Sequence, residues 1–132
     1  MSIVLDSLYY TEEHEWVKVE GNQATIGITD HAQDELGDIV FLELPKVDED
    51  FSSMDEIGVV ESVKTVSNLY MPISGRIIEI NDAVVEDPAL VNSSPYDEGW
   101  ILKIDMIEPA ELDYLKMSEE YKEIISLSED ND

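Results

Sequence analysis

The 132-residue chain contains no cysteine, which excludes both a disulfide framework and a thiolate metal site. Basic residues are also scarce: seven lysines and arginines stand against 32 aspartates and glutamates, for a net charge of −25. Such a surface repels phosphate backbones and anionic lipids, so we expect no binding to nucleic acid or membranes. It favours partner proteins with basic docking patches, although solubility in a saline cytoplasm explains the same charge.

Long hydrophobic runs are absent as well. The chain starts without a basic segment, and its first apolar run, residues 3–5, ends at Asp6. A signal peptide, a transit sequence and a transmembrane span are therefore not expected, and the predicted location is the cytoplasm. The length and the hydrophobic fraction of 43% fit one domain, residues 1–127, followed by an acidic, frayed tail at residues 128–132.

The sequence also lacks recognisable catalytic and metal-binding motifs. His14 and His31 do not have the spacing of metal ligands, and the acidic residues form no calcium-binding loop. There is no nucleophile elbow, P-loop or dinucleotide fingerprint, and no serine or lysine is paired with an evident base. We therefore predict no catalytic residues, no metal and no enzyme activity of its own.

Short β-like segments dominate what is present. The pair Gly21-Asn22 separates two of them and predicts a hairpin. Residues 48–56 and 92–99 are rich in polar and turn-forming residues and are expected to be loops. Short strands at this spacing predict a sandwich or barrel. Strands are expected at residues 8–20, 24–28, 38–44, 57–63, 69–71, 76–80 and 100–104.

Helical signals are confined to three places. Residues 29–37 have Thr29 or Asp30 as a candidate N-cap and Gly37 at the end, which predicts a short helix. Pro109 and Ser118 each precede apolar residues at helical spacing, so two C-terminal helices are expected to cover the sheet. The predicted fold is therefore mainly β with short helices. Trp16 and Trp100 are expected to fill the core.

Lys64 is the only basic residue between Lys46 and Arg76, and it lies between two predicted strands. Taken alone, a lysine in a turn is most simply a solvated side chain. Here the apolar strands fix a hairpin, Glu61 lies three residues earlier, and Lys64 is the one exposed amine in an acidic environment. This pattern predicts an acylation site in which a long flexible arm is attached to a rigid base.

Glu15 follows His14 and precedes Trp16 at a predicted strand start. The simpler interpretation is a solvated carboxylate. The alternative is a charge-assisted hydrogen bond to a cationic group carried on the arm of Lys64.

Five segments together resemble the glycine cleavage H-protein family, over about residues 8 to 122. The surroundings of Lys64 also resemble those of lipoyl domains generally, with Glu61 three residues before the lysine and Gly75 eleven residues after it. The segments that carry the family resemblance are residues 14–17, 27–33, 36–40, 60–64 and 92–96.

The resemblance implies a hybrid barrel-sandwich lipoyl-domain fold with C-terminal helices, and lipoic acid in amide linkage on Lys64. It implies three partner enzymes, the glycine decarboxylase (P protein), the aminomethyltransferase (T protein) and dihydrolipoamide dehydrogenase (L protein), besides a lipoate-attaching enzyme. It further implies a monomer whose loaded arm shelters against its own domain, with Glu15 and Asn68 as hosts for the arm's amine.

Some residues depart from the family pattern. Asp48 and Met54 replace two usual glycines, which predicts a different turn conformation there. Thr65 replaces a small residue and stiffens the turn without blocking the lysine. Three other functions remain open: a relay that donates lipoyl groups to other enzymes, an unmodified scaffolding domain, and a biotin carrier. The last is disfavoured because Val63 and Thr65 flank the lysine instead of two methionines.

Overall fold

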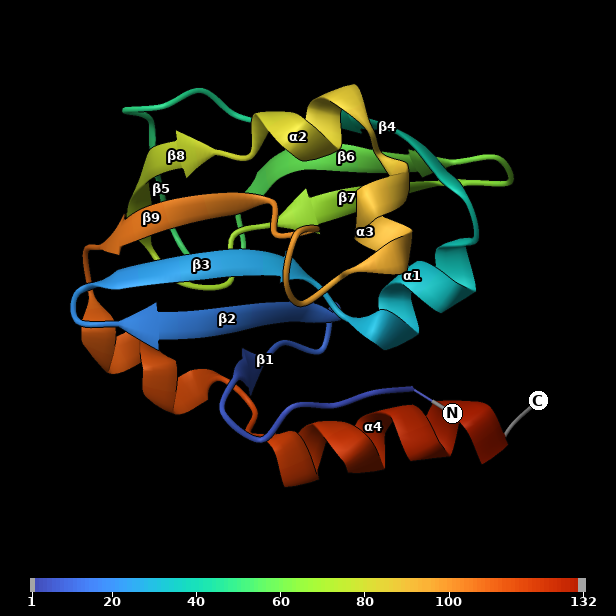
Figure 1. The fold of residues 1–132 in the computed structure, drawn as a ribbon. Helices are drawn as coiled ribbons and strands as arrows, with labels where there is room; N and C mark the ends of the chain where they lie inside the picture. The colour runs from blue at the N-terminus through green and yellow to red at the C-terminus, as the bar shows by residue number, and fades with distance from the viewer. Residues whose placement is uncertain (1, 131–132) are drawn as a thin grey trace.

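The computed structural model describes residues 2–130, with side chains as far as residue 127, as two antiparallel β-sheets joined by short helices (Figure 1). The larger sheet has the strand order β1-β2-β3-β9-β8-β5, and the smaller has the order β4-β6-β7. The larger sheet contains β1 (Tyr9–Tyr10), β2 (Glu15–Glu20), β3 (Gln23–Ile28), β9 (Leu102–Met106), β8 (Gly75–Ile80) and β5 (Asp50–Phe51). The smaller contains β4 (Ile39–Glu43), β6 (Glu56–Ser62) and β7 (Val66–Tyr70).

Helices connect and flank the two sheets. Within residues 2–130, no helix is long and apolar enough to cross a membrane. The helices are α1 (Asp30–Leu36), α2 (Asp82–Glu86), α3 (Ala89–Ser93), the 3₁₀-helix η1 (Pro109–Tyr114) and α4 (Ser118–Asp130).

The main core is built from side chains of both sheets. Ile26, Ile77 and Ile104 of the larger sheet are fully buried, and Val60 and Leu69 of the smaller sheet belong to the same cluster. Burying an aliphatic side chain of this size contributes about 1.5–3 kcal/mol. The core therefore holds the smaller sheet, which carries Lys64, firmly against the larger one.

Helix α1 joins the two sheets, and its caps are those expected from the sequence. Thr29 is the N-cap, and its hydroxyl accepts a hydrogen bond from the amide of Ala32 at 3.1 Å. Gly37 ends the helix at φ 79°, a conformation that favours glycine. The next residues enter β4, so the end of α1 is fixed beside the smaller sheet.

Several element boundaries differ from the prediction. The expected loop 48–56 contains the short strand β5, and β7 starts at Val66 instead of residue 69. The five-residue helices α2 and α3 were not predicted, because segments this short show no clear helical period. Helix α3 takes the first two residues of the expected loop 92–99, and the last strand runs over 102–106 instead of 100–104.

Asp48 and Met54 lie in turns with an unusual backbone conformation. Both residues have positive φ angles, 75° and 74°, which is the region that glycine adopts most easily. Their amides are held there by hydrogen bonds to the carbonyls of Ile77 at 2.8 Å and Met71 at 2.7 Å. The surrounding sheets thus impose the glycine-like turn on residues that do not favour it.

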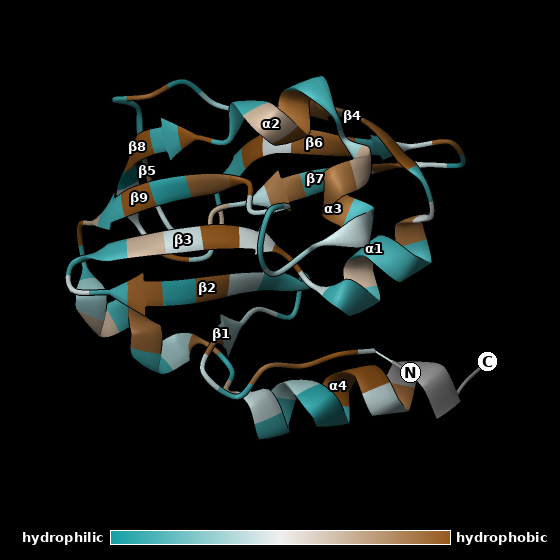
Figure 2. Cartoon of the chain, viewed as in Figure 1, coloured by the Kyte–Doolittle hydropathy of each residue, from teal (hydrophilic) through white to brown (hydrophobic). Residues whose placement is uncertain are grey.

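Helix α4 lies beside β1, the edge strand of the larger sheet, and the N-terminal segment runs next to it (Figure 1). The Tyr121 ring stacks on Tyr10 at 4.5 Å, in a second core cluster that also contains Trp16. Trp16 is thus buried as predicted, whereas Trp100 is only half-buried at the border of this cluster. Figure 2 shows apolar residues of α4 next to an apolar stretch of the N-terminal segment.

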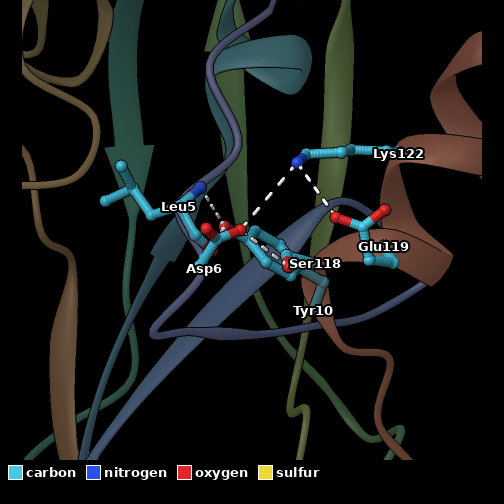
Figure 3. Close-up of polar contacts among 6 residues, drawn as sticks. All are labelled: Leu5, Asp6, Tyr10, Ser118, Glu119 and Lys122. Carbon is cyan, nitrogen blue, oxygen red and sulfur yellow. Dashed lines mark hydrogen bonds and ion pairs between the residues drawn. The ribbon is translucent and has the colours of Figure 1, made fainter.

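Polar contacts fasten the same two segments (Figure 3). Asp6 accepts a hydrogen bond from the Ser118 hydroxyl at 3.0 Å and forms an ion pair with Lys122 at 3.8 Å. The Tyr10 hydroxyl bonds the amide and the carbonyl of Leu5, each at 2.7 Å. The expected frayed tail, 128–132, continues α4 as far as Asp130, and its last two residues lie outside the described part of the chain.

Candidate functional site

The loop that carries Lys64 is fixed by Ser62. Strands β6 and β7 pair as far as Glu61 opposite Val66, which leaves residues 63–65 as the turn. The Ser62 amide donates to the Thr65 carbonyl at 2.8 Å, and the Ser62 hydroxyl oxygen accepts from the amides of Lys64 (3.3 Å) and Thr65 (3.1 Å). Sequence reasoning assigned no role to Ser62, although a serine that starts a turn commonly bonds the amides that follow it.

The Lys64 side chain is exposed and lies over the end of α1. Its Cε is 3.4 Å from the position that a Cβ on Gly37 would occupy. Among the side chains that the structure describes, no carboxylate forms an ion pair with Lys64. The turn is also bonded to this region, because the Val63 amide donates to the Asp38 carbonyl at 3.0 Å. An accessible amine on a turn fixed from two sides suits enzymatic acylation.

Glu61 and Gly75, which the sequence grouped with Lys64, lie in different sheets. Glu61 is half-buried on β6, opposite Phe41 on one side and Val66 on the other, at the base of the turn. Gly75 starts β8 in the larger sheet, where an added Cβ would be 2.8 Å from the Asp105 carbonyl oxygen. Gly75 therefore permits close packing of β8 on β9.

The interpretation of Glu15 as a solvated carboxylate is wrong. Its side chain is only 2% exposed, and its carboxyl accepts hydrogen bonds from the Tyr70 amide at 2.7 Å and the Thr11 hydroxyl at 3.3 Å. Burial raises the pKa of Glu15 to about 8, although both hydrogen bonds act to lower it. Because Tyr70 ends β7, Glu15 connects β2 of the larger sheet to the free edge of the sheet that carries Lys64.

Asn68 lies on β7, two residues before Tyr70, and is exposed. Its amide group is 3.4 Å from the Tyr70 hydroxyl and 3.5 Å from a carboxyl oxygen of Glu56. Glu15 and Asn68 therefore both bond Tyr70, the first at its backbone amide and the second at its hydroxyl.

A cavity of about 330 Å³ borders Thr11, the residue that bonds Glu15. Most of its lining is supplied by the β1–β2 turn, the loop before β6 and the segment after η1. Apolar lining residues, including Met54, Pro72 and Leu115, would suit an uncharged ring.

Both histidines contact neighbouring side chains. The Nδ1 atom of His14 is 2.8 Å from the Tyr121 hydroxyl, which also contacts the Thr29 hydroxyl at 2.7 Å. His31 pairs with Glu35 through Nε2 at 3.1 Å. In residues 2–130, no group of three or more histidine, aspartate or glutamate side chains is arranged to hold a metal ion. The rings of His14 and His31 lie 4.9 Å apart, so the β1–β2 turn, which carries His14, contacts both α1 and α4.

Comparisons with known proteins agree over nearly the whole chain. The family model described as "Glycine cleavage H-protein" matches residues 8–128. The chain is 52% identical to the glycine cleavage system H protein of Carboxydothermus hydrogenoformans, over 95% of this chain and 96% of the relative. It is 55% identical to the protein of that name from Methylacidiphilum infernorum, over 95% of this chain and 97% of the relative.

A solved structure gives the same result for the fold. The crystal structure of a glycine cleavage system H protein from Mycobacterium marinum superposes with a TM-score of 0.81 at 38% identity. It covers 89% of this chain and 95% of the other. The predicted fold class, mainly β with short helices in a barrel-sandwich arrangement, is confirmed.

Proposed function

Because the chain belongs to the glycine cleavage H-protein family, whose members carry covalently bound lipoate on a lysine, we propose that Lys64 is that lysine. The H protein is the non-catalytic lipoyl carrier of the glycine cleavage system, and it interacts with the P, T and L proteins and with a lipoate ligase. Bound on Lys64, the lipoyl group would supply the disulfide on which an aminomethyl unit is carried between the P and T proteins and which the L protein restores.

The observation that carries the proposal is the state of the Lys64 amine. Its side chain is exposed, it forms no ion pair with the described carboxylates, and the Ser62 bonds fix its backbone. The amine can therefore enter an acylating enzyme without first breaking an ion pair with a described carboxylate. An amide bond then removes its positive charge and leaves the arm mobile on a rigid base, which raises its effective concentration at successive enzymes.

The absence of cysteine from the sequence protects a lipoyl disulfide from thiol exchange within the chain. A lipoyl disulfide exchanges readily with a nearby thiolate. Since the sequence contains no cysteine, no thiol of this chain can divert it.

We further propose that Glu15 and Asn68 shelter the arm between partners. At about 3.3 Å per residue, Asn68 lies about 13 Å along the chain from Lys64. A lysine with its lipoyl chain reaches a similar distance, about 14 Å, at about 1.2 Å per bond. On the same scale Tyr70, whose amide Glu15 bonds, lies about 20 Å from Lys64, so in this proposal Asn68 meets the end of the arm and Glu15 holds the β7 backbone next to it.

Glu61 and Gly75 receive separate proposed roles. We propose that the lipoate-attaching enzyme recognises Glu61, which lies at the base of the turn. Gly75 is proposed to act indirectly, by keeping β8 close against β9. We also propose that the protein works in the cytoplasm, since a dithiol intermediate is maintained in a compartment that keeps thiols reduced. Its proposed monomeric state follows from the family resemblance alone.

The direct test of the attachment site is Lys64→Arg, with Lys46→Arg as the control in an exposed loop. Arginine keeps the charge but cannot form the lipoyl amide. We expect the Lys64 variant to lose glycine-dependent bicarbonate exchange with the P protein, and to keep its melting temperature because the side chain is exposed. The Lys46 variant should retain full activity. Activity in Lys64→Arg would place the arm on another residue.

A further inference from the structure

Asn92, near the end of α3, holds the connection between α1 and β4. Its Nδ2 atom donates to the Gly37 carbonyl at 2.8 Å and to the Gln33 side-chain oxygen at 3.0 Å. Its Oδ1 atom accepts from the Ile39 amide at 2.9 Å. One amide group thus ties together the last turn of α1, the residue that ends this helix and the first residue of β4.

The same connection touches the Lys64 turn at two points. The Asp38 carbonyl, between the two residues that Asn92 bonds, accepts the hydrogen bond from the Val63 amide at 3.0 Å. Gly37 lies under the Lys64 side chain. Val63 is outside the paired part of β6 and β7, which ends at Glu61 opposite Val66. The orientation of the turn therefore depends on where residues 37–39 are held.

We propose that Asn92 is a positioning residue for the acylation of Lys64. Its amide fixes residues 37–39, and these fix the turn that presents the amine. The inference rests on the proposed attachment of lipoate to Lys64. Two donated bonds and one accepted bond are needed, and only an amide side chain of this size supplies both kinds. Aspartate would keep the acceptor but place a carboxylate against the Gly37 carbonyl.

Asn81 provides a matched control elsewhere in the fold. Its Nδ2 atom donates to the carbonyls of Glu98 at 2.9 Å and Trp100 at 2.6 Å, and its Oδ1 atom accepts from the Ala83 amide at 3.1 Å. The two asparagines thus make the same kinds of bonds, but none of the Asn81 partners contacts the Lys64 turn.

The experiment compares Asn92→Asp with Asn81→Asp in the full chain. Lipoylation by a lipoate ligase with ATP and free lipoate is followed by intact mass over a range of protein concentrations, which separates kcat from KM. Hydrogen exchange of the Val63 amide, measured by NMR, reports the turn directly. If Asn92→Asp does not fold, Asn92→Ser and Asn81→Ser replace the pair.

For the Asn92 variant we expect kcat to fall about fivefold, with KM within about twofold, because a lost hydrogen bond misorients the amine without altering the docking surface. Val63 exchange should accelerate in this variant alone. Equal kcat values for the two variants, or unchanged Val63 exchange, would overturn the positioning role. If the chain without any substitution is not lipoylated at Lys64, the proposed attachment site itself is wrong.

Discussion

Among single residues, Glu15 shows most clearly how tertiary structure changes a side chain's chemistry. In sequence it is one of 32 acidic residues, at a position where a strand begins. In the fold it satisfies the Tyr70 amide at the free edge of the smaller sheet, and it is buried for that reason. No local pattern could predict this burial, because it depends on a strand more than fifty residues away.

The raised pKa of Glu15 predicts a dependence of stability on pH. Below its ordinary pKa of 4.5 the carboxyl is protonated in both states, whereas between 4.5 and about 8 only the unfolded chain releases the proton. The free energy of unfolding should therefore fall as the pH rises through this range. Glu15→Gln should remove about 5 kcal/mol of that fall, because the pKa of Glu15 is raised from 4.5 to about 8 and each pKa unit corresponds to about 1.36 kcal/mol.

Urea unfolding at several pH values, with the exposed Glu12→Gln as the control, measures this difference. If the free energy of unfolding changes with pH in the same way for Glu15→Gln and for the chain without substitutions, Glu15 is ionised in the folded protein and the prediction is wrong.

Met54 gives a second prediction for a single residue. Its φ of 74° is unfavourable for a residue with a side chain, by about 1–2 kcal/mol. Met54→Gly should therefore raise the free energy of unfolding by about 1 kcal/mol, after allowance for the greater freedom of glycine in the unfolded chain. Met117→Gly is the control, since Met117 is similarly exposed but has no positive φ, and it should destabilise. Chemical denaturation measures the free energy of unfolding of both variants. If Met54→Gly destabilises the protein, the backbone at Met54 is not strained and the prediction is wrong.

Among the secondary-structure elements, the sequence was most informative where a pattern is local. The hairpin of β2 and β3, the caps of α1 and the β6–β7 hairpin depend on neighbouring residues, and all three were predicted. Helices α2 and α3 were missed because each has only five residues. The part of the site formed by Asn92 was missed as well, since its role appears only when α3 packs beside the end of α1.

Helix α4 is joined to the rest of the fold through Tyr121, which predicts the effect of removing one hydroxyl. Tyr121→Phe keeps the stacking on Tyr10 but loses the bonds to His14 and Thr29. Losing the two hydrogen bonds of the Tyr121 hydroxyl should lower the free energy of unfolding by about 1–3 kcal/mol, although the Thr29 hydroxyl keeps its N-cap bond to α1. Tyr114→Phe, at a residue 84% exposed, should change it little. Thermal and urea unfolding provide the comparison, and an equal effect of both substitutions would contradict this link between α4 and the sheet.

At the scale of the whole molecule, the acidic surface and the exposed turn that carries Lys64 suit a carrier that binds several enzymes in succession. A net charge of −25 steers the protein toward basic docking surfaces and away from other polyanions. The two packed sheets give the arm a rigid base, and the turn at one end of the molecule presents it (Figure 1).

The attachment of lipoate to Lys64 is tested most directly by peptide mass spectrometry of the protein isolated from its native host grown with lipoate. We predict a lipoyl amide on the peptide that contains Lys64 and on no other lysine of the chain. An unmodified Lys64 in such cells, or lipoate on a different lysine, would contradict the account.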